Sequence, residues 1–318
     1  LTVTVTDAND GTISVSREVK YFDGEIVACT GGDLSIKGLD TSVKRLALKG
    51  SITVEDFKYI RESLTALEVL DISMTDLTEL PDRALRFGGD TPNTSLKAVR
   101  LPLSMKTIGY AAFTNCRALT SIDTENVEII GEWAFEQCRG LVEVKLHDGL
   151  KEIRRQAFYA CTLLKSEFFP YEDAYIDRAA LPNALQTLGA GVFTDCKNME
   201  SINMQRTQVK NILRNTYSGC SGITTFYYPN VVETIGEFAF SGCSALVGSF
   251  FPASLTSIET NAFHLCTKMS QVYCLGSTPP TLGTAAFDSS LKSISTLFVP
   301  EAAISAYSSS SWNPYFKE

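Results

Sequence analysis

Histidine is the residue whose scarcity most restricts what this sequence can do. Among 318 residues there are only two, His147 and His264, and neither has a partner at the spacing of metal ligands. Hydrolysis by a serine nucleophile usually needs a histidine base, and the Gly-x-Ser-x-Gly motif is absent as well. The sequence therefore gives no support to a metal centre or to a catalytic triad.

Long runs of positive charge and long apolar runs are also missing. The formal net charge is −8, and Lys and Arg form no long basic run, which argues against nucleic acid and anionic membranes as main partners. No apolar stretch reaches the roughly 18 residues that a transmembrane helix needs. The chain begins at Leu1 rather than Met, so we expect a mature or trimmed form whose ends do not reveal its localisation.

Signatures of common cofactor sites are absent too. No Cys-x-x-Cys pair occurs, although zinc sites favour such short spacings. Gly189-Ala190-Gly191 begins like a dinucleotide fingerprint, but Thr194 stands where the third glycine should be, and there is no phosphate-binding loop. We therefore expect no cofactor.

What the sequence does contain is an internal repeat, Ile-Gly-x-x-Ala-Phe-x-x-Cys-x-x-Leu-x-x-Ile. The first clear copy runs from Ile108 to Ile122, and a period near 23 residues lies within the range of leucine-rich repeats. We predict an α/β repeat protein, a right-handed leucine-rich-repeat solenoid with a concave parallel β-sheet and short turns or helical segments on the convex side. The aromatic position of the eight copies holds Phe113, Phe135, Phe158, Phe193, Tyr217, Phe240, Phe263 and Phe287.

Each coil of this solenoid is expected to contain one short strand and one tight return turn. In the second copy, Leu141, Val144 and Leu146 would point inward from the strand, and Phe135 would fill the layer opposite. Gly131 would allow a close approach of the main chain at the turn.

The ends of the chain depart from the repeat, as the caps of a solenoid do. We divide the chain into an N-terminal β-rich cap (1–40), irregular leucine-rich repeats (41–107), regular repeats (108–296) and a C-terminal cap (297–318). A β-hairpin is expected over residues 1–16 around Asn9-Asp10-Gly11, and a short helix over 52–65. One repeat interval is 35 residues, which indicates an insertion at about 170–182.

Seven of the nine cysteines occupy one position of the repeat. A ladder of this kind is typical of a small buried apolar residue, so we expect free buried thiols. Disulfides between neighbouring coils are not excluded by distance alone. For Cys29 and Cys274, outside the ladder, we expect burial and nothing more. The seven are Cys116, Cys138, Cys161, Cys196, Cys220, Cys243 and Cys266.

Acidic residues offer a weaker indication of chemistry. Glu132 and Glu136 flank Trp133 and Phe135, and a carboxylate pair for glycoside hydrolysis depends on separation in space, which the sequence leaves open. We interpret both glutamates as parts of a solvated turn.

Aromatic residues on the strands give the better indication of function. If Phe226 and Tyr228 point inward, Tyr227 points outward, and Val272 and Cys274 place Tyr273 outward in the same way. Phe168 and Phe250 fall at the equivalent position, but a bulge there could turn both rings inward, and we favour that reading while keeping both as candidates. The candidate partner-binding residues are Tyr227, Tyr273, Phe168 and Phe250, with Glu172, Asp173 and Asp177 of the acidic insertion at one edge.

The repeat, with Leu101-Pro102-Leu103-Ser104-Met105 and Phe251-Pro252-Ala253-Ser254-Leu255 leading into the next Ile, resembles the BspA-like leucine-rich-repeat family. The match covers about Leu96 to Pro300. It implies an exported bacterial surface protein, located outside the cell or on its surface. Some members are implicated in adhesion, and the family contributes no catalytic residues. The sequence departs from the pattern at Arg154 and Leu213, where Gly is expected, and at Tyr217, where Phe is expected.

Three functions remain open at this point. We favour a non-catalytic cell-surface module that mediates protein–protein or adhesive binding, with a protein or glycan partner and a monomeric state. The alternatives are a carbohydrate-binding or carbohydrate-active surface protein and a passive structural spacer. Outward aromatics clustered on the sheet would favour binding, whereas a uniformly hydrophilic sheet would favour the spacer.

Overall fold

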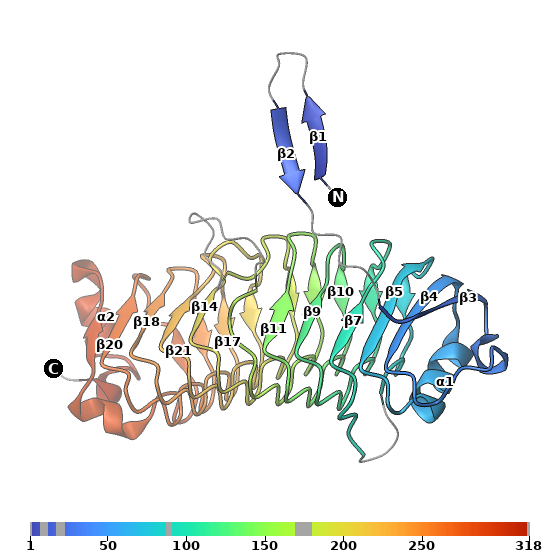
Figure 1. Cartoon of the computed structure of the whole chain (residues 1–318). Helices are drawn as coiled ribbons and strands as arrows, with labels where there is room; N and C mark the ends of the chain where they lie inside the picture. The colour runs from blue at the N-terminus through green and yellow to red at the C-terminus, as the bar shows by residue number, and fades with distance from the viewer. Residues whose placement is uncertain (1, 7–11, 17–22, 87–90, 169–179, 317–318) are drawn as a thin grey trace.

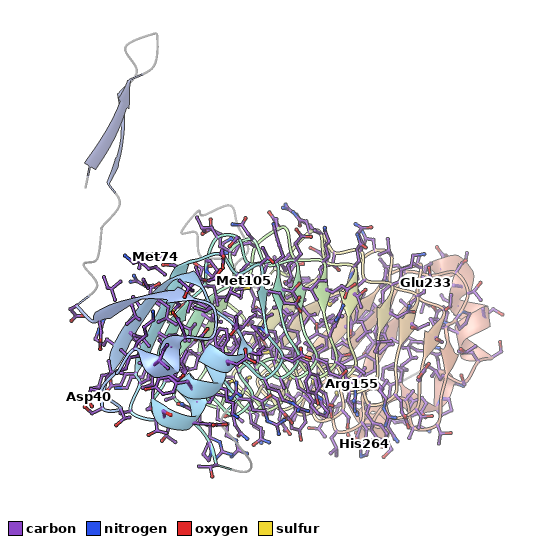
Figure 2. The ribbon with its side chains drawn as sticks, turned by 90° about the vertical axis from the view of Figure 1, so that its right-hand side faces the viewer. Asp40, Met74, Met105, Arg155, Glu233 and His264 are labelled. Carbon is purple, nitrogen blue, oxygen red and sulfur yellow. The ribbon has the colours of Figure 1, made fainter. Side chains whose placement is uncertain are left out.

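The computed structural model describes residues 2–6, 12–16, 23–86, 91–168 and 180–316. The described chain forms an elongated solenoid in which the longer strands follow one another along one side (Figure 1). Because each coil repeats the same turns, residues far apart in the sequence lie on the same side of the solenoid. Arg155 and His264, from the turns of different coils, both lie in the lower half of the molecule in Figure 2.

A first row of parallel strands runs along the solenoid, and its outward side chains form what we call the strand face. Six strands make its first sheet, paired in chain order, and two smaller sheets continue the row. The first sheet contains β3 (Glu25–Thr30), β4 (Arg45–Ser51), β5 (Val69–Thr75), β7 (Ala98–Arg100), β9 (Ser121–Asp123) and β11 (Glu143–Lys145). The smaller sheets pair β14 (Ser201–Asn203) with β16 (Thr225–Tyr227), and β18 (Gly248–Phe251) with β20 (Gln271–Cys274) and β22 (Thr296–Phe298).

A second row of two-residue strands was not expected, since the repeat predicted one strand in each coil. Its buried β-branched residues, such as Ile108 and Ile130, alternate with partly exposed ones, which suits a short strand. A Cβ atom on Gly131 would lie 2.6 Å from the Ile108 carbonyl oxygen, so the expected close approach is confirmed. The row contains β6 (Glu79–Leu80), β8 (Thr107–Ile108), β10 (Ile129–Ile130), β12 (Glu152–Ile153) and β13 (Thr187–Leu188), then β15 (Asn211–Ile212), β17 (Thr234–Ile235), β19 (Ser257–Ile258) and β21 (Thr281–Leu282).

A third row of hydrogen bonds joins the turns that carry the aromatic position. In the first regular coil the N–H groups of Ala111, Phe113 and Asn115 donate to carbonyls of the next coil at 2.7–2.9 Å. The first and last of these residues have positive φ angles of 52° and 64°. Later coils repeat this arrangement, so most regular coils contain two residues in the left-handed region.

Inside the coils, the eight aromatic rings form one continuous stack. Successive ring centroids lie 4.9 to 5.6 Å apart, with interplanar angles of 15° or less. The insertion does not interrupt the stack, because Phe158 and Phe193 remain 5.5 Å apart. The prediction that the aromatic position fills the core is confirmed.

The repeated cysteines are buried free thiols, and each has a defined hydrogen-bonding role. The Cys138 thiol donates to the Phe113 carbonyl at 3.0 Å, and the Cys220 thiol donates to the Phe193 carbonyl at 2.9 Å. All seven thiols of the ladder reach the preceding coil in this way. Cysteine suits this position because it is small and apolar yet can donate a weak hydrogen bond. Burial raises the pKa of Cys138 well above its usual range and that of Cys266 to about 12.

The N-terminal end contains the predicted hairpin and helix. Strands β1 (Thr2–Thr6) and β2 (Thr12–Ser16) pair antiparallel in a sheet of their own. Helix α1 (Val54–Ser63) buries Phe57 and Ile60, and a capping box between Thr53 and Asp56 fixes its start. The Asp56 carboxylate also accepts from Gly32 N–H at 2.7 Å, which ties the helix to the loop after β3. A short 3₁₀ helix, η1 (Leu34–Ile36), lies between β3 and β4.

The C-terminal segment covers the last coil, with Trp312 as its anchor. The indole is fully buried, packs against Phe287 at 5.3 Å and donates from Nε1 to the Pro280 carbonyl at 2.8 Å. The elements of this segment and the turn before it are η2 (Ser289–Ser293), η3 (Glu301–Ala303), α2 (Ile304–Ser308) and η4 (Asn313–Tyr315).

Candidate binding surface

The N-terminal half of the strand face is charged. Paired register positions on neighbouring strands place Asp71 beside Arg100 and Asp123 beside Lys145. The Arg100 guanidinium lies 3.4 Å from the Asp71 carboxylate, and His147 Nε2 lies 2.8 Å from an Asp123 oxygen. His147 is therefore a partly exposed residue with a carboxylate neighbour.

The C-terminal half of the strand face is aromatic. Tyr227, Phe250 and Phe298 are 44, 56 and 40% exposed, and Tyr273 is half-buried between the last two. The Phe250 and Tyr273 rings stack at 4.3 Å and 5°, and Tyr273 and Phe298 stack at 4.4 Å and 10°. We call Tyr227, Phe250, Tyr273 and Phe298 the aromatic strip. The outward orientation of Tyr227 and Tyr273 that alternation predicts is confirmed.

Strand register and inward packing position this strip. Phe250 pairs with Tyr273 and Tyr273 with Phe298, so the three rings must lie at the spacing of neighbouring strands. Beneath them, buried residues alternate with the strip: Phe226, Tyr228, Ser249, Phe251, Val272 and Cys274. The Tyr228 hydroxyl lies 3.1 Å from Ser249 Oγ, and burial raises the pKa of this tyrosine well above its usual range.

The inward orientation that we favoured for both rings is found at Phe168 and not at Phe250. Phe168 is 1% exposed and packs 6.1 Å from Phe193, so it does not reach the strand face and is removed from the candidate surface. Its segment forms no regular strand, and Ser166 points inward there, its hydroxyl accepting from the N–H groups of Glu200 and Ser201. Phe250 lies in the regular strand β18, where Ser249 and Phe251 fill the inner positions and leave it outward.

The acidic insertion residues Glu172, Asp173 and Asp177 lie outside the residues that the structure describes. A strip member that the sequence argument missed is Phe298, which we had assigned to the C-terminal cap. Leu297 and Val299 are both partly buried on either side of it, so the alternation that identified Tyr227 could also have identified Phe298.

The glutamates singled out in the sequence occupy different environments. Glu132 lies 2.9 Å from the Arg155 guanidinium on the exposed turn. Glu136 is partly buried, and this burial raises the pKa of its carboxyl group.

Within the described ranges, no group of three or more His, Cys, Asp or Glu side chains is arranged to hold a metal ion. None of the helices described is long and apolar enough to cross a membrane.

Comparison with known families identifies the repeat. The model of the BspA type leucine-rich repeat region matches six copies, over residues 92–186 and 167–294, which is more than half of the chain. The chain belongs to the BspA-type leucine-rich-repeat family. The resemblance that the repeat suggested is thereby confirmed, and the match includes the strands that carry Tyr227, Phe250 and Tyr273.

Several solved structures of bacterial proteins are similar to this BspA-type chain. A leucine-rich repeat protein from Bacteroides ovatus shares 24% identity, covering 83% of this chain and 80% of that one, with a TM-score of 0.36. A leucine rich cell surface protein from Faecalibacterium prausnitzii shares 14% identity over 96 and 95% of the two chains, with a TM-score of 0.42. The pneumococcal vaccine antigen PcpA shares 15% identity over 81 and 62%, also with a TM-score of 0.42. No curated protein matches the chain.

Proposed function

We propose that this chain is an exported, non-catalytic cell-surface protein that binds a partner through the aromatic strip. The observation that carries the proposal is the exposure of the strip. Tyr227, Phe250 and Phe298 are each at least 40% exposed on the strand face, where they come from the two neighbouring C-terminal sheets. Large aromatic side chains dominate binding energies when a partner covers them, and rings held by a sheet lose little conformational entropy on binding.

The family supports this proposal, because BspA-type proteins are typically exported surface proteins. A passive spacer is less well supported, since a spacer needs no exposed apolar surface and would be expected to have a hydrophilic strand face throughout. A carbohydrate-active enzyme would need two carboxyl groups facing each other across a cleft. Glu132, one of the two glutamates that the sequence singled out, is instead paired with Arg155 on an exposed turn.

A binding screen with variants of the strip tests the proposal. The whole chain would be immobilised and exposed to collagen, laminin, mucin and an array of neutral glycans. We expect at least one of these to bind, and the double variant Phe250→Ser, Phe298→Ser to weaken that binding at least about tenfold, as loss of two central aromatic contacts does.

The matched control replaces charged residues on β11, outside the aromatic strip but on the same strand face. Glu143→Ser with Lys145→Ser alters the outward positions of β11 and should leave the affinity within about twofold. Equal binding by the folded strip variant and the parent chain would contradict the proposal.

A further inference from the structure

The aromatic strip ends at a strand edge, and this end has features that identify a class of partner. Strand β22 is the last member of its sheet, and among the described strands it pairs with β20 alone. An unpaired edge presents main-chain donors and acceptors to an added strand, and proteins usually protect such edges with charged residues. Neither Thr296, Leu297 nor Phe298 is charged.

Charge is absent from the whole C-terminal part of the row. Each of the six strands of the first sheet contains at least one charged residue, whereas β16, β18, β20 and β22 contain none. A charged partner would lose its hydration here without gaining a counter-charge, which costs free energy. The strip therefore favours an uncharged partner.

Ring orientation decides which faces of the strip are open. Both faces of Tyr273 are covered, because Phe250 stacks on one side at 4.3 Å and Phe298 on the other at 4.4 Å. A sugar binds an aromatic residue by lying flat on the ring face, so the interior of the stack offers it only ring edges. The face of Phe298 that is turned away from Tyr273 is directed along the stack to the unpaired side of β22.

A largely apolar hollow lies on the other side of the same strand. Its volume is about 480 Å³, and it is lined by Leu297, Val299, Ile304, Tyr307 and Phe316 together with the uncharged polar residues Ser308 and Asn313. Ile304 is 53% exposed, so a partner can reach it. Leu297 and Val299 alternate with Phe298, so β22 has the aromatic strip on one side and the hollow on the other.

We propose that β22 is the docking edge for an extended, uncharged polypeptide segment of a partner protein. The segment adds a parallel or antiparallel strand to β22, as in other complexes formed by strand addition. One set of its alternate side chains stacks beside Phe298, and the other set enters the hollow at Ile304. A glycan could contact the ring but offers no main chain for the edge and no aliphatic side chain for the hollow. This inference rests on the proposed function and assigns the strip a polypeptide partner.

The test uses a phage library of random 12-residue peptides selected on the whole chain. We expect the selected peptides to be uncharged, with aromatic or aliphatic residues at alternate positions. Their affinity should change less than about twofold between 0.1 and 1 M NaCl, because no ion pair is formed. Phe298→Ser and, separately, Ile304→Ser should each weaken binding at least about fivefold, whereas Glu143→Ser with Lys145→Ser should not. Both test residues are at least 40% exposed, so the variants are expected to fold.

A synthetic peptide N-methylated at alternate residues examines the main-chain pairing. Methylation on the side that faces β22 should abolish binding, and methylation on the opposite side should not. Charged or salt-sensitive peptides, or equal binding of both methylated forms, would overturn the inference. If neutral glycans bind the strip and peptides do not, the proposed function stands and the polypeptide assignment fails. If neither glycans nor peptides bind the strip, the proposed function and the polypeptide assignment both fail. A dimer in light scattering that Phe298→Ser dissociates would then show that a second copy of the chain occupies the edge.

Discussion

Left-handed backbone conformations at the turns are a feature of single residues that the sequence hardly signals. Some of these positions hold Gly or Asn, such as Gly219 and Asn261, but others hold Trp133, Phe238 and Leu265. A non-glycine residue there costs about 1–2 kcal/mol in steric strain. The turns keep this conformation because most of these residues donate their N–H to a carbonyl of the next coil, and Leu265 donates to the Asp288 carboxylate there.

Replacing such a residue with glycine should therefore stabilise the protein or leave its stability unchanged. Leu265 has a φ of 60° and is 50% exposed, so Leu265→Gly removes strain and loses little packing. We expect the free energy of unfolding to rise by up to about 1 kcal/mol, after the cost of a more flexible chain is subtracted. Leu163→Gly is the control, because Leu163 is similarly exposed and has no positive φ. Leu163→Gly should lower the free energy of unfolding. An equal loss in both variants would show that backbone strain at Leu265 does not determine the effect.

The buried thiols lead to a second prediction at the scale of residues. All nine cysteines are buried, and burial raises the pKa of Cys29 to about 11 and that of Cys274 to about 12. Since a thiol reacts as its thiolate, a raised pKa keeps these groups neutral and unreactive at pH 8. Iodoacetamide at pH 8 should label none of the nine in the native chain and all nine after denaturation, as counted by mass spectrometry. Rapid labelling of any ladder cysteine in the native state would contradict this.

At the scale of elements, the stacked rings of the strip should stabilise one another. Tyr273 loses two ring contacts on substitution, and Phe250 loses one. Each aromatic contact contributes about 0.5–1.5 kcal/mol to the free energy of unfolding. Tyr273→Ala should therefore lower this free energy by about 1–3 kcal/mol, and Phe250→Ala by about half as much. Tyr227→Ala should be nearly neutral, since Tyr227 is 44% exposed and stacks on none of the other described rings of the strand face. Urea unfolding of the three variants measures this order, and equal losses would show that the outer stack does not contribute.

The same elements show how far the sequence could predict the structure. The regular spacing of Phe, Cys and Leu was sufficient to predict the solenoid, the aromatic core and the buried thiols, because these positions repeat along the regular coils. Outward Tyr227 and Tyr273 followed from alternation within a strand. The second strand row could not be predicted, since a strand of two residues leaves no periodic pattern to detect.

Phe168 and Phe250 show why the remaining part of the surface was difficult to predict. Both are preceded by an acidic or serine residue and followed by Phe-Pro, and both lie four residues after the repeat leucine. Phe168 points inward because Ser166 bonds to the main chain of the next coil, whereas Phe250 points outward because Ser249 fills an inner position of the paired strand β18. That difference depends on the neighbouring coil and not on the local sequence.

At the scale of the whole molecule, ion pairs connect coils along the exposed edge. Glu128 lies 2.7 Å from Lys151 and 3.2 Å from Lys106, which belong to the coils on either side. Glu68 is placed between Lys97 and Lys44 in the same way. Hydrogen bonds from these lysines, those of Lys151 and Lys97 first, hold the pKa of each glutamate below its usual value.

A lowered pKa makes the stability depend on pH in a defined direction. The contribution of each ionised glutamate to the free energy of unfolding is fully present above its unfolded-state pKa of about 4.3. It is lost as the pH falls through the lower pKa of the folded state. Glu128→Gln should therefore reduce the fall in melting temperature between pH 5 and pH 3 relative to the parent chain, by a small amount because the pair is exposed. Glu125→Gln, an exposed neighbour, is the control, and 0.5 M NaCl should remove most of the difference. Identical pH profiles for the parent chain and Glu128→Gln would exclude this contribution.

Successive coils are not joined equally along the molecule. Between the coil of Phe193 and the coil of Tyr217, β13 and β15 are not paired, so the second row is interrupted, whereas β14 pairs with β16 and the third row is continuous. There the Phe193 N–H donates to the Thr216 carbonyl at 2.9 Å. This step of the solenoid lacks the second-row pairing of the regular steps, so we expect the second row to open there first. Amide hydrogen exchange should accordingly be faster in β15 than in β17, which pairs with the coil before it, and equal protection would mean that the interruption does not loosen the step.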